Sequence, residues 1–268
     1  MRIGIIGGGF MGEAFLRGIL RAEVAAPGEV AVAESLPPKR AILAEHGVRV
    51  TDDAQSACIG ADLVLLAVKP QDLPHVAEGL RGAFSGGAVV VSIAAGVPLA
   101  AVQRHTGHRA CVRVMPNLPA AIGEGAAAYY PAPEVNLDQR TQVRRLLGAV
   151  CSAVIEVADD EAVDLATALH GSGPAYVYLV IESMIDAAVR LGMKRADASS
   201  LVLATFVGSA RYAQETGTHP AELRAAVTSP GGTTAAAIRE LESAAVRAAF
   251  DDAIEAAFLR AQELGELA

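Results

Sequence analysis

Tryptophan is absent from this 268-residue sequence, and aromatic residues make up only 4% of it. Hydrophobic residues nevertheless account for 52%, so the core must be built from alanine, valine, leucine and isoleucine rather than from large rings. Such small side chains let helices approach closely, which favours a helical bundle or a large subunit interface. The length is sufficient for one large domain or two modest ones, each with its own core.

Cysteine is scarce, and long hydrophobic runs are missing. Cys58, Cys111 and Cys151 lack the spacing of metal ligands, and an odd number of thiols fits free structural cysteines in a reducing compartment. The longest apolar runs, Leu63–Val68 and Ala88–Ala95, are far shorter than the roughly 20 residues of a membrane-spanning helix. Glycines interrupt the apolar start of the chain, which excludes a signal-peptide pattern. These absences predict a cytoplasmic protein.

Positive charge is in deficit, with 22 Lys and Arg against 30 Asp and Glu and a formal net charge of −8. No Lys/Arg-rich patch stands out, which argues against nucleic-acid binding. No cluster of His, Cys or Asp has metal-ligand spacing, so we expect no metal. Anionic ligands would therefore have to be held by backbone amides, helix N-termini and a few basic residues.

The first half of the chain alternates short apolar runs with helical stretches. Strands are predicted at 2–6, 29–34, 48–50, 62–68, 88–93, 110–114 and 125–130. Helices are predicted at 10–21 and 37–46. This alternation is typical of an α/β fold with a mostly parallel sheet that is covered by helices on both faces.

The pattern changes near residue 158, beyond which we find no convincing strand. Helices are predicted at 161–191, 195–216, 221–228, 233–242 and 246–264. Two glycines and a proline interrupt the first of them at Gly171–Pro174, which predicts a loop that opens a new helix at Pro174. We therefore divide the chain into an α/β domain at 1–158 and an all-α domain at 159–268.

A glycine-rich loop follows the first predicted strand. The segment Gly7–Gly12 satisfies the pattern Gly-x-Gly-x-x-Gly between a strand and a helix, which is typical of a Rossmann dinucleotide-binding domain. The first glycine permits a tight turn, the second leaves room for the pyrophosphate, and the third lets the helix pack tightly on the strand. The helix N-terminus then offers free amides and a partial positive charge to the phosphates.

The end of the second predicted strand bears on the choice between NADH and NADPH. Glu34 lies where an acidic residue usually binds the ribose 2′-hydroxyl of NAD. Ser35, Lys39 and Arg40 instead provide a hydroxyl and two cations that could hold the 2′-phosphate of NADP. Lys39 and Arg40 equally fit charges on a solvated helix surface, so the preference stays open.

Two further segments end predicted strands, where ligands of open α/β sheets bind. Ala67–Pro70 ends the fourth strand, and Lys69 within it could contact the cofactor phosphates or order the loop. Ser92–Gly96 ends the next strand in small residues, which leave room for a nicotinamide ring.

A third unusual segment lies in the helical half, where Thr228–Thr234 reads Thr-Ser-Pro-Gly-Gly-Thr-Thr and runs into a predicted helix. Gly231 and Gly232 leave their backbone amides accessible, and Thr233 and Thr234 add hydroxyl groups at the helix N-terminus. This combination favours an anion site suited to a carboxylate. A plain helix-capping turn is the alternative interpretation.

The order and spacing of five segments resemble those of the pyrroline-5-carboxylate reductases. They are Gly7–Gly12, Ala67–Pro70, Met115–Pro119, Gly171–Ala175 and Ser229–Thr234, and the likeness spans essentially the whole chain. The resemblance implies an N-terminal Rossmann domain and a helical C-terminal domain for substrate binding and dimerisation. It also implies reduction of 1-pyrroline-5-carboxylate to L-proline by NADPH or NADH, the last step of proline biosynthesis. The expected assembly is a homodimer with interlocked helical domains, or a larger oligomer such as a decamer.

The resemblance also assigns roles to residues by their position. The substrate would be bound at Ser229, Gly231, Gly232 and Thr233, with Thr234 beside the ring nitrogen as the catalytic residue. The cofactor would be bound at Ile6, Gly7, Gly8, Gly9, Phe10, Met11, Ser35, Ala67, Val68, Lys69 and Pro70, with Ile93, Ala94 and Ala95 near the nicotinamide, and Arg40 is added for its charge. Two positions depart from the family pattern, His170 beside the Gly-Ser-Gly-Pro segment and Ala54 near the adenosine.

The implied chemistry needs little from side chains. A protonated cyclic imine is already electrophilic, so the main task is to hold two rings face to face. Two alternatives are a related NAD(P)-dependent oxidoreductase of imines or β-hydroxyacids, and a non-catalytic nucleotide-binding regulatory protein. The β-hydroxyacid dehydrogenases use a lysine in the first interdomain helix, and Pro174–Arg190 contains none. A carboxylate loop beside a nicotinamide site argues against the regulatory protein.

Overall fold

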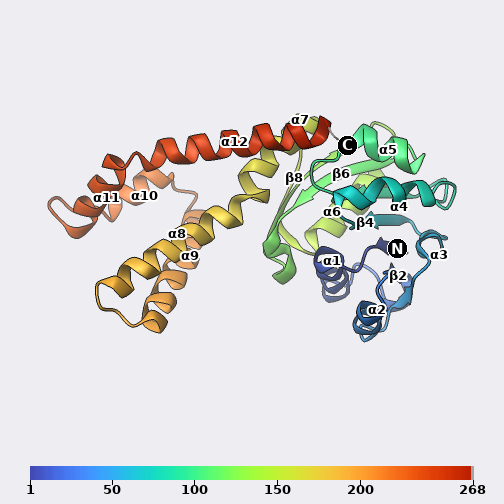
Figure 1. Cartoon of the computed structure of the whole chain (residues 1–268), viewed down its shortest axis with the longest axis horizontal. Coiled ribbons are helices and arrows are strands. Elements are labelled where there is room, and N and C mark those ends of the chain that lie inside the picture. The colour runs from blue at the N-terminus through green and yellow to red at the C-terminus, as the bar shows by residue number, and fades with distance from the viewer. Residues whose placement is uncertain (267–268) are drawn as a thin grey trace. The chain divides into compact units, whose positions relative to one another are not determined.

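The computed structural model describes residues 1–266, which form two compact units (Figure 1). The first unit is Met1–Pro174 together with the end of the chain from Ala256, and the second is Ala175–Glu255. Across the described residues, no helix is both long enough and apolar enough to pass through a membrane.

The first unit is built on an eight-stranded sheet. Its strands are β1 (Ile3–Ile6), β2 (Val30–Ala33), β3 (Arg49–Thr51), β4 (Leu63–Leu66), β5 (Val89–Ser92), β6 (Cys111–Pro116), β7 (Gly125–Pro131) and β8 (Cys151–Glu156). Their order is β3-β2-β1-β4-β5-β6-β7-β8, and every neighbouring pair is parallel except β6 with β7. All residues of β1, β2, β4 and β5 are buried, as apolar runs covered on both faces require. The predicted α/β fold with a mostly parallel sheet is confirmed.

Helices connect the strands and cover the sheet. They are α1 (Phe10–Arg21), α2 (Pro37–Ala44), α3 (Ala54–Cys58), α4 (Leu73–Gly79), α5 (Leu99–Thr106) and α6 (Leu137–Gly148), with short 3-10 segments η1 (Pro27–Glu29), η2 (Pro70–Asp72) and η3 (Leu118–Ile122). The sequence predicted α1 at its observed bounds and α2 with an end two residues too late. It did not identify α3 to α6, and α3, α4 and α5 are too short for a helical repeat to show.

Strand β8 was also not predicted from the sequence. It lies at the edge of the sheet and pairs in parallel with β7 on one side only. Cys151 is buried, whereas Ser152, Ala153, Ile155 and Glu156 are exposed. A strand with so little burial has neither a continuous apolar run nor the strict alternation by which strands are identified in a sequence.

A turn of π-helix ends at Gly171, where the sequence predicted a loop that opens a new helix at Pro174. The predicted loop is wrong, whereas a new helix does begin, at Gly173. The chain passes in turn through α7 (Asp160–Ala166), the π-helical turn η4 (Thr167–Gly171) and α8 (Gly173–Arg190). The amide of Ser172 donates to the carbonyl oxygen of Thr167 at 2.9 Å, and this five-residue spacing defines the wider turn. The backbone therefore stays helical across both glycines.

The side chain of Asn117 explains how a proline is accommodated here. In a regular α-helix the amide at position 174 would donate to the carbonyl oxygen of His170, but Pro174 has no N–H. The side-chain amide of Asn117, from the loop after β6, donates to that carbonyl oxygen instead, at 3.1 Å. The imidazole of His170 lies 2.9 Å from the carbonyl oxygen of Met115. His170, which departs from the family pattern, thus has a defined hydrogen-bond partner at the end of β6.

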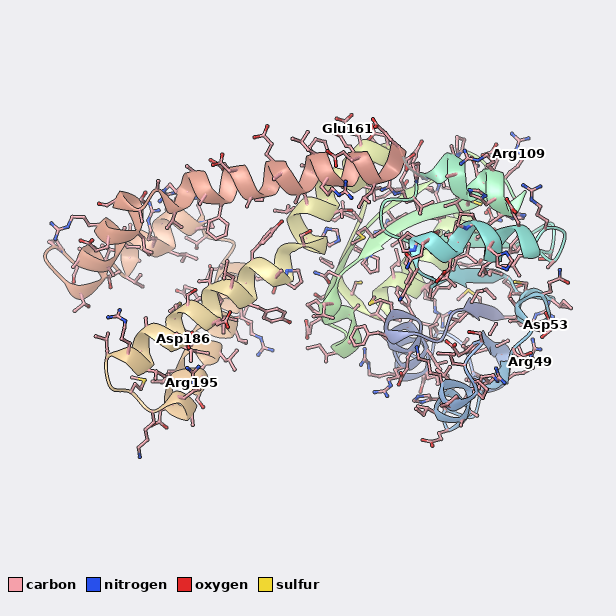
Figure 2. All side chains as sticks on the ribbon, viewed as in Figure 1. Arg49, Asp53, Arg109, Glu161, Asp186 and Arg195 are labelled. Atoms are coloured by element: carbon pink, nitrogen blue, oxygen red, sulfur yellow. The ribbon has the colours of Figure 1, made fainter. Side chains whose placement is uncertain are left out.

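The second unit consists of helices. They are the rest of α8, α9 (Arg195–Thr216), α10 (Pro220–Ala226), α11 (Thr233–Ser243) and the first part of α12 (Val246–Glu266). Each was predicted from the sequence to within two residues at its ends. Figure 2 shows Asp186 of α8 beside Arg195 of α9, and this ion pair measures 2.8 Å.

These helices bury few of their own side chains. Among the described residues of α8 to α11, Ala198 and Val202 are the buried ones. Leu179, Leu201 and Tyr212 are 63%, 58% and 60% exposed. Exposed apolar surface of this extent marks an interaction site, so the second unit offers a face that another chain can cover.

Helix α1 approaches the turn before β8 so closely that position 18 has room only for glycine. A Cβ on Gly18 would overlap Cγ1 of Val150 and lie 2.8 Å from the carbonyl oxygen of Ala149. The side chain of Val150 is fully buried, so neither neighbour can move away freely. Gly148, the last residue of α6, has open space where its Cβ would be.

We expect Gly18→Ala to destabilise the protein by about 1–3 kcal/mol, because overpacking outweighs the helix propensity of alanine, which is worth about 1 kcal/mol. Gly148→Ala is the matched control and should leave the melting temperature unchanged or slightly raised. Thermal unfolding followed by circular dichroism measures both variants against the parent. A Gly18→Ala variant that melts with the parent would contradict the close packing of α1.

Candidate functional site

A cleft of about 530 Å³ opens at the carboxyl ends of β1, β2 and β4. Seven of the residues predicted to bind the cofactor line it, namely Ile6, Gly7, Gly9, Ser35, Ala67, Val68 and Lys69. Glu34, Lys39 and Ala54 also line it, as do Asp52, Asp72 and His75, which the sequence analysis did not single out. The sequence could have indicated them by position, because Asp52 directly follows β3, and Asp72 and His75 lie at the start of α4, the helix after β4.

The glycine loop leaves this cleft open to a ligand. Gly7 has a φ of +101°, a backbone conformation that glycine adopts without strain, and its amide donates to the carbonyl oxygen of Ala33 at 2.9 Å. Nothing lies within 4 Å of the place where a Cβ on Gly9 would be. Gly9 also caps α1 without any side-chain hydrogen bond to the first turn, so the first amides of α1 are left for an anion. These features fit a dinucleotide.

Three residues of the glycine loop, Phe10, Met11 and Gly12, do not line the cleft. Phe10 and Met11 form the first turn of α1 and do not line the cleft, so their contribution would be backbone amides. A Cβ on Gly12 would overlap the carbonyl oxygen of Gly7. The third glycine therefore lets the helix pack against the turn of the loop itself.

The carboxylate of Glu34 holds the glycine loop against β2. One oxygen accepts from the amide of Gly8 at 3.0 Å, and the other accepts from the amide of Leu36 at 2.9 Å. The side chain is buried, so these bonds offset the cost of taking a charge out of water. Glu34 thus has a structural partner on each oxygen, in addition to any contact with a ribose.

Arg40 lies against Ser35 and is fixed in place by backbone oxygens. Its Nη1 donates to the carbonyl oxygens of Glu34 at 3.0 Å and of Ser35 at 2.8 Å, and its Nη2 is 3.6 Å from Oδ2 of Asp52. Arg40 does not line the cleft, whereas Lys39 does. The structure therefore places one cation in the cleft wall and a second one behind Ser35.

The ends of β1, β4 and β5 lie side by side. The amide of Ala67 donates to the carbonyl oxygen of Ile6 at 2.8 Å, and the amide of Ile93 donates to that of Leu66 at 3.1 Å. Ile93 and Ala94 are buried and do not line the cleft. Pro70 and Ala95 line a neighbouring cavity of about 480 Å³. The segment predicted to face the nicotinamide thus directly adjoins the cleft, one strand further along the sheet.

The predicted substrate loop lies in the second unit, at the start of α11. Gly231 has a φ of +70°, and the amide of Gly232 donates to the carbonyl oxygen of Ser229 at 3.1 Å. Gly232 caps α11 with no side-chain hydrogen bond to the first turn. Thr233 and Thr234 are the first two residues of the helix, and Thr234 is half-buried. This helix N-terminus has free amides, as a carboxylate site requires.

The three cysteines do not provide a nucleophile. Cys58, Cys111 and Cys151 are free and buried, and burial raises the pKa of each thiol to about 12. A thiol with so high a pKa carries almost no thiolate at neutral pH. Within residues 1–266, no three His, Cys, Asp or Glu side chains form a group that could hold a metal ion.

Known proteins match this chain along its whole length. A family model described as pyrroline-5-carboxylate reductase dimerisation matches residues 160–264, and one described as NADP oxidoreductase, coenzyme F420-dependent, matches residues 2–96. A pyrroline-5-carboxylate reductase of Synechocystis sp. is 41% identical over 99% of both chains. The structure of a pyrroline-5-carboxylate reductase from Coxiella burnetii has a TM-score of 0.91 at 36% identity over 98% of both chains. That of Plasmodium falciparum pyrroline carboxylate reductase with NADP bound has a TM-score of 0.88 at 28% identity, over 99% of this chain and 98% of that one. The chain therefore belongs to the pyrroline-5-carboxylate reductase family.

Proposed function

We propose that this protein reduces 1-pyrroline-5-carboxylate to L-proline by hydride transfer from NAD(P)H. The observation that carries the proposal is that one chain of this family has both an open glycine loop at α1 and an uncapped helix N-terminus at α11. The first suits a pyrophosphate and the second suits a carboxylate. The cofactor is supported by the NADP oxidoreductase family model that matches residues 2–96 and by the Plasmodium relative with NADP bound.

The first unit would hold and orient the cofactor. NAD(P)H supplies the hydride when bound. The amides of the first turn of α1 would bind the pyrophosphate, because Gly9 leaves their approach open. Ser35 would meet the adenosine ribose, and Ile93–Ala95 would lie beside the nicotinamide. Small residues at Ala94 and Ala95 leave space for a ring at that point.

The second unit would bind the imine. The amides at the start of α11 would hold the carboxylate, with Ser229, Gly231, Gly232 and Thr233 around it. The hydroxyl of Thr234 would hydrogen-bond the ring nitrogen and orient the ring. Carbon 5 of a protonated imine accepts hydride without a strong general acid, so orientation is the main contribution, worth several kcal/mol of the barrier.

The helical residues also support a dimer. The family model that matches residues 160–264 is described as a dimerisation domain, and α8 and α9 expose apolar side chains that a partner would cover. The match to this family model begins at residue 160, which supports our division of the chain into domains at 1–158 and 159–268. A higher assembly such as a decamer and a cytoplasmic location remain proposals based on the family resemblance and the composition.

A turnover assay on the purified chain tests the proposed function and its rivals. We expect NADPH oxidation that depends on 1-pyrroline-5-carboxylate, forms proline and survives exhaustive chelation. A β-hydroxyacid with NADP is the matched alternative substrate and should give no reaction, since α8 has no lysine. Cofactor binding without turnover of either substrate would support the regulatory protein and overturn the proposal.

Lys39 and Arg40, the two cations near Ser35, suggest a means by which the protein would distinguish NADPH from NADH. We expect Arg40→Ala to weaken NADPH binding about tenfold to a hundredfold and NADH binding much less, because only NADPH carries the 2′-phosphate that a charged hydrogen bond would hold. Fluorescence titration with each cofactor measures this. Lys39→Ala shows whether the cation in the cleft wall shares the role.

Arg49→Ala is the control for the Arg40 variant. Arg49 of β3, labelled in Figure 2, also donates to a backbone carbonyl and, like Arg40, does not line the cleft, but its partner is Ser56, at 2.8 Å, rather than Glu34 and Ser35. This change removes the same charge and should leave both affinities unaltered. An equal loss of NADPH and NADH affinity in Arg40→Ala would show that Arg40 does not contact the phosphate.

Thr234 is predicted to matter more than any other hydroxyl group in the helical half. Loss of one hydrogen bond to a reacting group costs about 1–3 kcal/mol, so Thr234→Ala should lower kcat/KM about tenfold to a hundredfold. The affinity for NADPH should hardly change, and Thr234→Ser should keep much of the activity. If Thr234 only stabilised the start of α11, the Ala variant would melt earlier but keep its kinetics. Steady-state kinetics with melting temperatures on the same preparations separate these outcomes.

A further inference from the structure

A buried arginine and two carboxylates connect β6, α7 and the start of α5. Arg113 of β6 is only 2% exposed. Its Nη1 donates to Oδ1 of Asp160 at 2.7 Å, and its Nη2 pairs with Oδ1 of Asp164. Asp160 and Asp164 are both on α7, so one guanidinium binds two successive turns of the same helix. A buried arginine held by charged partners on both nitrogens has little freedom to reorient.

Asp160 makes one contact that Asp164 lacks. Its Oδ1 also accepts a hydrogen bond from the amide of Leu99 at 3.0 Å. Leu99 is the first residue of α5, where a backbone amide has no partner within its own helix. Asp160 therefore links the buried arginine to the backbone at the point where α5 begins.

The segment 93–98, between β5 and α5, is thus fixed at both ends and at its middle. At its start, the amide of Ile93 donates to Leu66 of β4. At its middle, Gly96 packs against α12 so closely that a Cβ there would lie 2.8 Å from Cβ of Leu264. At its end, the amide of Leu99 is bound by Asp160. Of these three anchors, Asp160 is the one made by a side-chain carboxyl group.

We propose that Asp160 is a positioning residue for hydride transfer, acting through the Leu99 amide on the loop at 93–98. The inference rests on the proposed function, in which Ile93–Ala95 lie beside the nicotinamide. Arg113 holds the carboxylate of Asp160 in place, and the carboxylate holds the loop. Asp164 stabilises the same arginine but does not touch the loop. A small displacement of a reacting group can cost about a hundredfold in rate, so a loop freed at one end should lower kcat.

The test compares Asp160→Ala with Asp164→Ala, which remove equal charge from the same arginine. We expect kcat to fall about tenfold or more in Asp160→Ala only, with a larger isotope effect for NADPH deuterated at the transferred position. The affinity for NADPH should change by less than about twofold, because the glycine loop and Glu34 are untouched. Hydrogen exchange in the free protein should show the Leu99 amide less protected in Asp160→Ala than in Asp164→Ala.

Asp160→Asn is the rescue variant, since its side-chain oxygen can still accept from Leu99, and it should recover much of kcat. If Asp160→Ala does not fold, Asp160→Ser takes its place, because serine suits the first turn of a helix but is too short to reach. Equal kcat losses in the two Ala variants, or an unchanged kcat and isotope effect in Asp160→Ala, would overturn the inference. A wild-type protein that does not turn over 1-pyrroline-5-carboxylate would instead overturn the proposed function.

Discussion

The register of three parallel strands decides where the parts of the cofactor cleft are placed. Ile6 of β1 pairs with Leu66 of β4, and Leu66 pairs with Ser92 of β5, so the loops that follow leave the sheet at one level. Two backbone hydrogen bonds beyond the strands, from Ala67 and Ile93, extend this alignment into the loops. The turn at the glycine loop, the wall of the cleft and the segment 93–98 therefore depend on this register.

Features set by local pattern could be predicted from the sequence. Buried strands show as apolar runs, and the glycine loop and the start of α11 show as glycines beside helices. Features set by distant partners could not be predicted. The carbonyl group of His170 in the π-helical turn is bound by Asn117, which lies 53 positions earlier in the sequence. Similarly, the link from Arg113 through Asp160 to Leu99 joins three elements whose contact no local pattern indicates.

In the candidate cofactor site, too, the sequence predicts local features but not the partners that side chains bind. The sequence placed Glu34 directly after β2 and Arg40 in the helix that follows, because strand ends and helix starts are local properties. It did not reveal that the carboxylate of Glu34 binds two backbone amides or that Arg40 binds two carbonyl oxygens. Those partners follow from how the chain turns after β2. A charged residue near a binding site can thus fix the backbone of that site by hydrogen bonds, in addition to any direct contact with the ligand.

The two units differ in how they bury apolar surface. The first has a continuous core of aliphatic side chains around its sheet, whereas α8 to α11 bury only Ala198 and Val202 among their described residues. If a second copy of the chain covers the exposed faces of these helices, their folding is a bimolecular equilibrium. Mass action then makes the stability of the helical half rise with protein concentration. A cell that makes little of this protein would hold a larger fraction of it with that half open to proteases.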